Sequence, residues 1–446
     1  MSQGRKKLTI VQRMFVAVLL GILAGVGFIA LRGAIGAGSD VWKLIYQALF
    51  VDITSEAGTN GLGLFYIVSQ LFMHMLQVAI IPVVLVSLAL SICSLAQPER
   101  LGRIAVRMLV TFFCLYVAAA TVAGIVSYLV AQSGGFTVTL PEAEVVETKL
   151  VDAYNPLSII VNIVPSNMFT AMSDNGSVLA VCFIGIVAGI CMAKMGERAK
   201  PIKDLLESLN ELIQIFVNFV LGKLGPLSIF CMVTRSLAVY GTDYLRPAAV
   251  WIATTMLLCI LLAFALYPAA VALVARLNPI TFARKSAKIA LFGAATQSSA
   301  ATLPLNMETC VNELGCSRDV ASFVLPTGAT INMNGTTTMQ IIAVTFIGTA
   351  AGIQMTPALI ATAALIAITV SMGTPPIPAA GATLVSVVML GAGLNTPLCL
   401  VGYSLVLALN YVPGMGVMPM NVVGDAATAV IVSKLEGTLD KERYDA

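Results

Sequence analysis

One carboxylate stands alone in the last third of the chain, because Asp425 is the only charged residue between positions 320 and 433. An ionised carboxylate in apolar surroundings persists when it meets a cation, a proton or a base. No Lys or Arg lies near Asp425 in the sequence. We therefore predict that Asp425 is a ligand for a bound cation. The alternative is a protonated, hydrogen-bonded aspartate with a structural role.

An oxygen-rich segment precedes Asp425. Residues 327–338, TGATINMNGTTT, place two amides and several hydroxyls inside a run that is otherwise apolar. Adjacent Asn and Gly residues favour local unwinding of a helix, which leaves backbone carbonyls without partners. A hard monovalent cation needs oxygen ligands of this kind. The alternative, hydrogen bonding between helices, explains one or two such residues but not this density.

The composition places these residues in a membrane protein. Hydrophobic residues make up 58% of the 446 residues and charged ones only 11%, whereas a soluble domain carries roughly a quarter charged residues. The chain has enough apolar runs of about 20 residues for eight or so spans. The nine cysteines show no metal-ligand spacing and His74 is the only histidine, so neither residue type predicts a metal centre.

Apolar runs bounded by charged or loop residues define the elements. Six of them lie near 10–32, 66–96, 104–132, 163–194, 205–239 and 248–277. Basic residues precede the first run and follow the second, fourth and sixth, and the C-terminal tail is basic as well. By the positive-inside rule we predict a multi-pass protein of the cell membrane (inner or plasma membrane) with both termini cytoplasmic.

Two stretches beyond residue 289 share a design of apolar arms around a small, hydroxyl-bearing, prolyl tip. They are residues 296–304 (TQSSAATLP) and 371–381 (SMGTPPIPAAG). Such tips are poor continuous helix, and irregular backbone survives at membrane depth only when buried in protein or lining a wet cavity. We predict a pair of re-entrant helical hairpins that meet near the midplane and mark a binding site. Two Pro-kinked ordinary spans are the alternative.

These motifs together resemble the dicarboxylate/amino acid:cation symporter family, to which the glutamate transporters belong. The matching pieces are SSAATLP at 298–304, TGATINMNGTT at 327–337, the 373–381 tip and NVVGDAATAVIVSK at 421–434. PERLGR at 98–103 and IIPVVLVSL at 80–88 extend the match over nearly the whole chain.

The resemblance implies an all-α integral membrane fold of the glutamate-transporter type, with eight transmembrane helices, two re-entrant hairpins and inverted repeats. It implies a homotrimer in the lipid bilayer, in which a transport domain moves as an elevator against a scaffold. The scaffold would comprise residues 1–96 and 163–239. The transport domain would comprise residues 104–132, 246–277 and the core 280–435, before a cytoplasmic tail at 436–446.

The function implied is sodium-coupled symport of a small carboxylate or amino acid, with Na+ as the coupling ion and no organic cofactor or nucleic-acid partner. Carried over, Gly328, Asn332, Asn421 and Asp425 would form one sodium site. Thr330, Met333, Ser371, Met372 and Thr374 would form a second one under the outer hairpin. The substrate site would use Ser298, Ser299, Thr336, Gly373, Thr374, Ile377, Pro378, Gly381, Gly414, Val417, Met418 and Asn421. Of these, Ser299 and Asn421 would hold a carboxylate.

Positions for a third sodium ion depart from the family pattern. Well-studied members have an acid where this chain has Asn334. They also use hydroxyls on the third span, where alignment places Phe112, Leu115 and Tyr116. We therefore predict that the third site is absent.

The positions that recognise charged substrates also differ from the family pattern. Amino acid carriers have an aspartate in the last span, and carriers of acidic substrates add an arginine; the corresponding residues here are Gly414 and Val417, with Met418 beside them. Gln297 stands at the inner tip, where some members carry arginine. Because an unpaired charge in a closed site is expensive, we predict a solute less polar than glutamate or aspartate, with one carboxylate.

Other function classes fit these residues less well. A proton can replace sodium at Asp425, although the oxygen-rich surroundings favour a metal cation. A channel would need a continuous polar pore instead of two dead-ended hairpins. An intramembrane aspartyl protease would need a second embedded aspartate, and a serine protease would need a Ser–His dyad. We therefore predict that the chain is not an enzyme.

Overall fold

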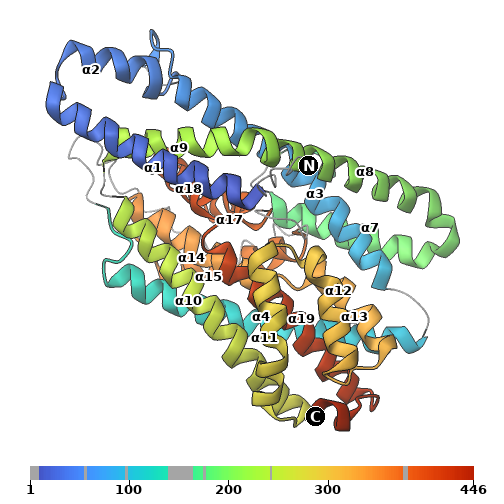
Figure 1. The fold of residues 1–446 in the computed structure, drawn as a ribbon. Coiled ribbons are helices and arrows are strands. Elements are labelled where there is room, and N and C mark those ends of the chain that lie inside the picture. Colours follow the sequence, from blue (N-terminus) through green and yellow to red (C-terminus); the bar gives the residue numbers. More distant parts are fainter. Residues whose placement is uncertain are drawn as a thin grey trace, which may run out of the picture.

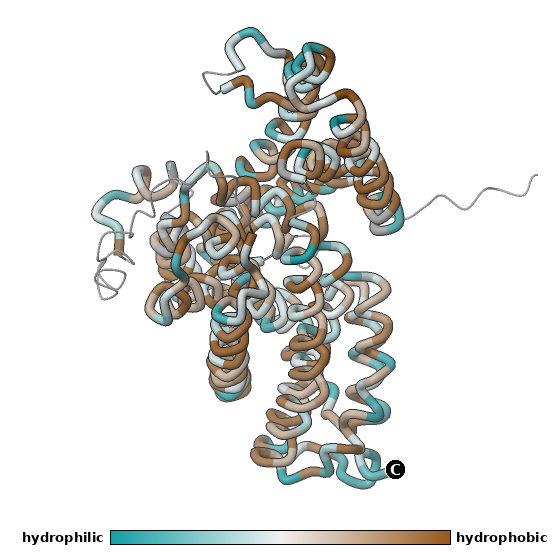
Figure 2. The backbone as a smooth tube through the Cα atoms, turned by 90° about the vertical axis from the view of Figure 1, so that its left-hand side faces the viewer, coloured by the Kyte–Doolittle hydropathy of each residue, from teal (hydrophilic) through white to brown (hydrophobic). Residues whose placement is uncertain are grey.

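The computed structural model describes residues 10–54, 58–95, 99–138, 164–173, 177–241, 244–374 and 380–446. Every regular element in these ranges is a helix. Six stretches are long and apolar enough to cross a membrane: Gln12–Ile35, Leu64–Leu90, Gly102–Gln132, Ala180–Val239, Leu245–Ala275 and Gly414–Leu435. Figure 2 shows hydrophobic residues along the helices and hydrophilic ones at the turns beside the C terminus. The prediction of an all-α chain is confirmed.

The helices form two groups that differ in their packing partners. In the first group α1 lies along α9, and α3 packs on α7, α8 and α9. These helices cross the upper part of Figure 1. The elements are α1 (Ile10–Ile35), α2 (Asp40–Ile45), the π-helix η1 (Tyr46–Phe50), α3 (Leu64–Leu95), α6 (Met168–Met172), α7 (Val178–Met195), η4 (Gly196–Ala199), α8 (Lys200–Phe219), η5 (Val220–Leu224) and α9 (Gly225–Tyr240).

The second group is built around α14 and α19, which pack on one another and on α4 and α10. Both central helices are buried almost throughout. The elements are α4 (Glu99–Gln132), α10 (Leu245–Ala270), η6 (Val271–Ala275), α11 (Pro279–Thr296), α12 (Ser299–Asn312), α13 (Arg318–Ile331), α14 (Asn334–Ala350), α15 (Pro357–Ser371), α16 (Ala380–Thr383), α17 (Val385–Gly391), α18 (Pro397–Leu409), α19 (Gly414–Leu435) and α20 (Lys441–Asp445).

The two groups overlap the expected scaffold and transport ranges. They meet where α18 packs on α9, α15 on α7 and α16 on α3. The independent movement of the two groups stays a prediction.

The first hairpin consists of α11 and α12, which pack on each other and on α19. Its tip is shorter than the predicted 296–304 segment, because only Gln297 and Ser298 lie outside the helices. Gln297 adopts a left-handed conformation with φ 50° and ψ 33°, and the Ser298 side chain accepts a hydrogen bond from the backbone N–H of Ala301. That cap lets the following alanines enter a helix that also contains Pro304. The expectation of irregular backbone from Ser299 to Pro304 is therefore wrong.

The oxygen-rich segment interrupts a helix, as its sequence predicted. α13 ends at Ile331 and α14 begins at Asn334. Asn332 and Met333 have ψ angles of 79° and 47°, outside the helical region. The break is buried, since Asn332 and Met333 are 1% and 2% exposed.

The second hairpin lies against α14. Its first arm α15 ends at Ser371, and its second arm begins with α16 at Ala380 and continues in α17. Residues 375–379, which include the predicted substrate ligands Ile377 and Pro378, lie outside the described residues. Beyond this hairpin lie α18 and α19, which are separated by an interruption between Leu409 and Gly414.

A close crossing of α14 and α19 depends on Gly335. A Cβ atom added at Gly335 would overlap the backbone oxygen of Val417, which has no freedom to move aside. Forcing extra volume into a packed core costs about 1–3 kcal/mol. We predict that Gly335→Ala destabilises the protein by this amount. The control Gly27→Ala places its Cβ in open space on α1, and thermal unfolding should show it to be neutral or stabilised.

Candidate functional site

Asp425 lies at the centre of a cluster formed by α13, the helix break and α19. Its side chain is 2% exposed. Asn332 Nδ2 donates a hydrogen bond to Asp425 Oδ1 at 2.8 Å and lies 3.2 Å from the backbone oxygen of Asn421. The carboxylate fits only because residue 328 is glycine, since a Cβ atom there would overlap Asp425 Oδ1. The structure thus brings the four residues of the first predicted sodium site together.

The acceptors in this cluster exceed the donors. Asn332 Oδ1 is buried and has no hydrogen-bond donor among the described residues. Among the described residues Asp425 receives one hydrogen bond, from the Asn332 amide, and no cationic side chain lies within 4 Å of it. A buried anion with one donor is costly, and so is a buried amide oxygen without a partner. A cation bound at this cluster would neutralise the carboxylate.

Tyr116 of α4 closes the backbone break beside this cluster. Its hydroxyl donates to the backbone oxygen of Ile331 and accepts from the backbone N–H of Met333, each at 2.6 Å. Unpaired backbone groups inside a membrane protein cost several kcal/mol each. One phenol therefore satisfies a donor and an acceptor that the break would otherwise leave free.

Asn421 links the cation cluster to the predicted substrate side. Its Oδ1 accepts hydrogen bonds from the backbone N–H groups of Gly335 and Thr336, at 2.8 and 3.4 Å. Its Nδ2 lies 3.2 Å from Thr336 Oγ1 and 3.3 Å from Met333 Sδ. The second hairpin approaches the same point, because a Cβ atom at Gly381 would lie 2.5 Å from Thr336 Cγ2.

The first hairpin tip faces the α18–α19 interruption. Ser299 Oγ lies 3.3 Å from Met418 Sδ. Gln297 is 3% exposed, and its Nε2 donates to the backbone oxygen of Tyr411 at 2.8 Å. A Cβ atom at Gly414 would lie 2.6 Å from Gln297 Oε1, so the glycine makes room for the amide. This side of the site contains no charged residue among those described.

The second predicted sodium set comes from two elements: Thr330 and Met333 belong to α13 and the helix break, and the other three residues lie at the end of α15. Thr330 Oγ1 donates to the Thr327 oxygen within α13, whereas Ser371 Oγ donates to Gln340 Oε1 and Thr374 Oγ1 to the Val370 oxygen. In the described ranges no hydrogen bond joins the two halves of the set. Gly373 faces α3, where Val84 lies 3.5 Å from the position of a Cβ atom.

The positions expected for a third sodium ion hold uncharged side chains. Asn334 Nδ2 donates to the hydroxyl of Tyr267 at 3.1 Å. Phe112 packs against Gly328, with its ring 3.1 Å from the position of a Cβ atom. Tyr116 is occupied by the backbone break. The absence of the third site stays a prediction, and these contacts supply no carboxylate for it.

Two polar residues that the sequence analysis did not single out hold the site in place. Gln340 of α14 donates from Nε2 to the oxygen of Gly381 at 3.0 Å and accepts from Ser371, so it joins both arms of the second hairpin. Asn306 of α12 donates to the oxygen of Val422 at 2.9 Å, which attaches the first hairpin to α19. The available signal was an amide side chain inside each predicted hydrophobic segment, a signal that Asn312 in α12 and Asn334 in α14 share.

The family model described as the sodium:dicarboxylate symporter family matches residues 10–435. A proton/sodium-glutamate symport protein of Bacillus caldotenax is 25% identical over 383 residues, which cover 84% of this chain and 89% of that protein. A C4-dicarboxylate transport protein of Rhodospirillum rubrum is 28% identical over 83% of this chain and 83% of that protein. One of Sinorhizobium medicae is 28% identical over 90% of this chain and 90% of that protein.

The chain belongs to the sodium:dicarboxylate symporter family. It is therefore a membrane transporter of the symporter class and not an enzyme, and the family resemblance drawn from its motifs is confirmed. The glutamate-transporter-like, all-α fold is confirmed with it.

Tyr116→Phe tests whether the phenol supports the helix break. Loss of the hydroxyl leaves the Ile331 oxygen and the Met333 N–H unpaired, and an unsatisfied buried polar group costs about 1–3 kcal/mol. We predict a destabilisation of at least that size in chemical or thermal unfolding. Tyr128→Phe on the same helix is the matched control, because no hydrogen bond of its hydroxyl is found in the described residues. Equal stability of the two variants would contradict the assignment.

Proposed function

We propose that the chain is a secondary active symporter that couples sodium influx to uptake of a small carboxylate-bearing solute other than glutamate or aspartate. The observation that carries the proposal is the Asp425–Asn332 cluster, in which a buried carboxylate receives a hydrogen bond from one amide and, among the described residues, has no cationic side chain within 4 Å. Sodium prefers such oxygen ligands and neutralises the charge that burial makes expensive. Relatives named as proton/sodium or dicarboxylate symport proteins support the coupling.

Asn421 supplies the physical link between ion and solute. Its backbone oxygen lies beside Asn332, and its amide lies beside Thr336. Binding of sodium next to Asp425 would fix this residue and therefore the groups that face the solute. Each ligand then raises the affinity of the protein for the other by the same factor.

We propose the class of solute from the charged residues that this chain lacks at the substrate-recognition positions. Family members that carry acidic amino acids have charged residues at three positions where this chain has none. Here these positions hold the amide of Gln297, the backbone of Gly414 and the apolar side chain of Val417. Ser299 and Asn421 remain as donors for one carboxylate. A second carboxylate would enter the site without a partner and lose its hydration. We therefore propose an organic acid or amino acid less polar than glutamate.

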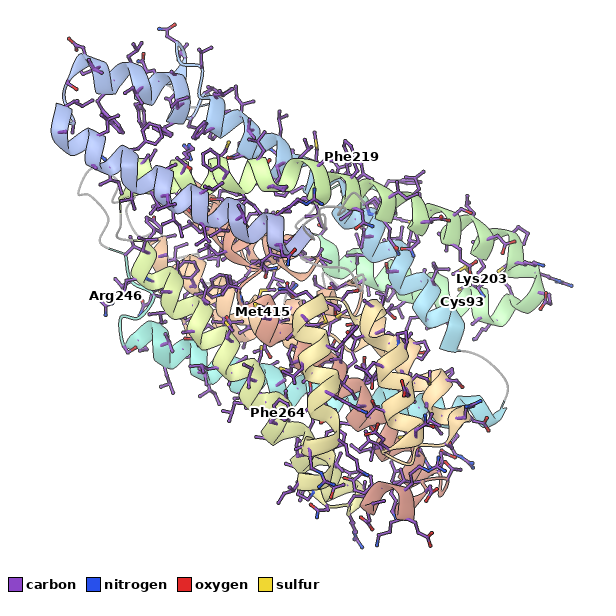
Figure 3. The ribbon with its side chains drawn as sticks, in the orientation of Figure 1. Cys93, Lys203, Phe219, Arg246, Phe264 and Met415 are labelled. Atoms are coloured by element: carbon purple, nitrogen blue, oxygen red, sulfur yellow. The ribbon has the colours of Figure 1, made fainter. Side chains whose placement is uncertain are left out.

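The exposed face of α8 supports a homotrimer. The spacing is three then four residues from Ile202 through Leu205 and Leu209 to Leu212, and Phe219 follows seven residues later. These five side chains are 37–66% exposed. This heptad-like stripe is typical of helices that pack on a second copy. Lys203, which lies 3.7 Å from Glu207, flanks the stripe. Figure 3 shows Lys203 and Phe219 along the α8 edge of the molecule.

Clustered basic residues support a cytoplasmic C terminus. Arg103 and Arg107 at the start of α4 bind Glu436 after α19, at 2.9 and 2.8 Å. Lys285 of the first hairpin donates to backbone oxygens of Arg443 and Tyr444 in the tail. Three basic segments thus meet at one end of the second group, which the positive-inside rule assigns to the cytoplasm of a cell-membrane protein. We propose that this second helix group is the transport domain, which moves as an elevator against the scaffold.

A proton-coupled carrier of the same fold is the second candidate. The relative from Bacillus caldotenax is named for both protons and sodium, and a protonated Asp425 would also remove the buried charge. The two candidates differ in which gradient drives uptake.

Sodium-driven uptake into proteoliposomes tests the proposal. We predict that wild-type protein accumulates a monocarboxylate or neutral amino acid with an inward sodium gradient, but not with an inward potassium or proton gradient. Loss of a charged ligand costs about 1.5–3 kcal/mol, so Asp425→Asn should reduce sodium-driven uptake by about tenfold or more. Asp319→Asn, at an exposed position of α13, is the control. Uptake driven by protons alone would favour the second candidate.

Gln297→Arg tests the substrate class. A guanidinium at the first hairpin tip restores a partner for a second carboxylate, and a hydrogen bond to a charged group contributes about 1.5–3 kcal/mol. We predict that succinate or aspartate inhibits uptake by this variant at roughly ten- to hundredfold lower concentration than in wild type. Gln297→Met is the control of similar size. Tight aspartate binding by wild-type protein contradicts the proposal.

A further inference from the structure

A cavity of about 350 Å³ lies where the two helix groups meet, and it contains none of the residues assigned to the ion or solute sites. Pockets of this size hold small molecules. The first group contributes residues after η1 and on α3 and α9, and the second contributes residues on α18. The polar members are Asp52, Tyr66, Ser69, Gln70, Arg235, Ser236 and Ser404, and the apolar ones are Met73, Met232, Pro397, Leu398, Leu400 and Val401.

Arg235, which is half-buried, supplies open donors to the cavity. Its Nε donates to the backbone oxygen of Phe50 at 2.7 Å. Its guanidinium carbon lies 4.9 Å from the ring centroid of Tyr66, which also lines the cavity. In the described part of the chain the two terminal nitrogens of Arg235 have no hydrogen-bond acceptor. These nitrogens have the planar arrangement that binds a carboxylate through two bonds.

Asp52, the one acid of the lining, is already engaged. Its Oδ1 accepts hydrogen bonds from the backbone N–H and the hydroxyl of Thr54, at 2.8 and 2.6 Å. Burial alone would raise the pKa of Asp52, but the bonds from Thr54 and Tyr66 and the charge of Arg235 together lower it. No ion pair joins Asp52 to Arg235 in the described residues. The acid of the cavity is therefore hydrogen-bonded to Thr54, whereas the terminal nitrogens of Arg235 have no acceptor among the described residues, which favours an anion over a cation.

The apolar residues that line the cavity indicate that the ligand has an apolar body in addition to its anionic head. Met73 and Met232 face it from the first group, and Leu398, Leu400 and Val401 face it from α18. Methionine side chains adapt to irregular shapes and make favourable contacts with aromatic rings. A ligand with a polar head and a compact apolar body would therefore use the entire lining.

We propose that this cavity binds a small amphipathic carboxylate, with its head on Arg235 and its apolar body against Met232 and α18. The site is separate from the proposed symport site and does not depend on that function. Because both helix groups line the cavity, the bound molecule holds α18 against α3 and α9. Occupancy therefore favours this arrangement of the two groups over any arrangement that separates them.

Binding to the purified full-length protein in phosphatidylcholine nanodiscs tests the proposal, with 4-phenylbutyrate as the probe. We predict saturable binding by calorimetry and a rise in the unfolding temperature. The alcohol 4-phenylbutanol and the amine 4-phenylbutylamine have the same body without the anion, and each should bind roughly tenfold more weakly or worse. Equal binding of either control compound, or no saturable binding of the probe, overturns the proposal.

Three variants locate the bound probe. Arg235→Gln removes the head contact, and Ser404→Leu fills the cavity from α18 without altering Arg235; both should weaken binding by roughly tenfold or more. Asp425→Asn should bind the probe as wild type does, with or without sodium. Unchanged binding in both cavity variants overturns the proposal, as does lost binding in Asp425→Asn, which would place the probe at the solute site. Failure of sodium-driven uptake in wild type leaves this result untouched.

Discussion

A broken helix in the middle of a membrane protein must find partners for its free backbone groups, and the rest of the site depends on how this chain meets that constraint. The break at Asn332 and Met333 has no water to rely on at 1–2% exposure. Tyr116 from α4 satisfies one donor and one acceptor, and Asn421 from α19 binds the first N–H groups of α14. Two helices that do not contain the break, α4 and α19, therefore hold it in place.

The helix break also positions the residues of the ion cluster. Once the backbone unwinds, the Asn332 amide nitrogen reaches Asp425 on α19, and the Asn332 side-chain oxygen has no hydrogen-bond donor among the described residues. Glycines at 328 and 335 allow the helices to approach closely enough for these contacts. Asn421 then belongs both to the ion cluster and to the face that the second hairpin covers through Thr336. In the proposed mechanism, shared residues of this kind make the two binding events depend on one another.

The sequence predicted those parts of the site that depend on residues close together in the chain. A lone Asp425 in an uncharged segment and the Asn-rich TINMNG stretch predicted the cluster and the helix break. The first hairpin tip was placed correctly but made too long, because the capping role of Ser298 turns the following residues into helix. Tyr116, Gln340 and the Arg235 cavity depend on contacts between helices far apart in the chain. No local pattern records such contacts, so they emerged only from the structure.

Sodium-dependent thermal unfolding of the purified protein tests the central claim most directly. The measurement compares sodium with potassium at equal ionic strength, without any solute, in wild type and in Asp425→Asn. A ligand that binds only the folded state raises the unfolding temperature by mass action. The account predicts a sodium-specific rise in wild type that saturates and that disappears in the variant. An equal rise in both proteins, or none in wild type, would contradict the assignment of Asp425 and Asn332 as the sodium site.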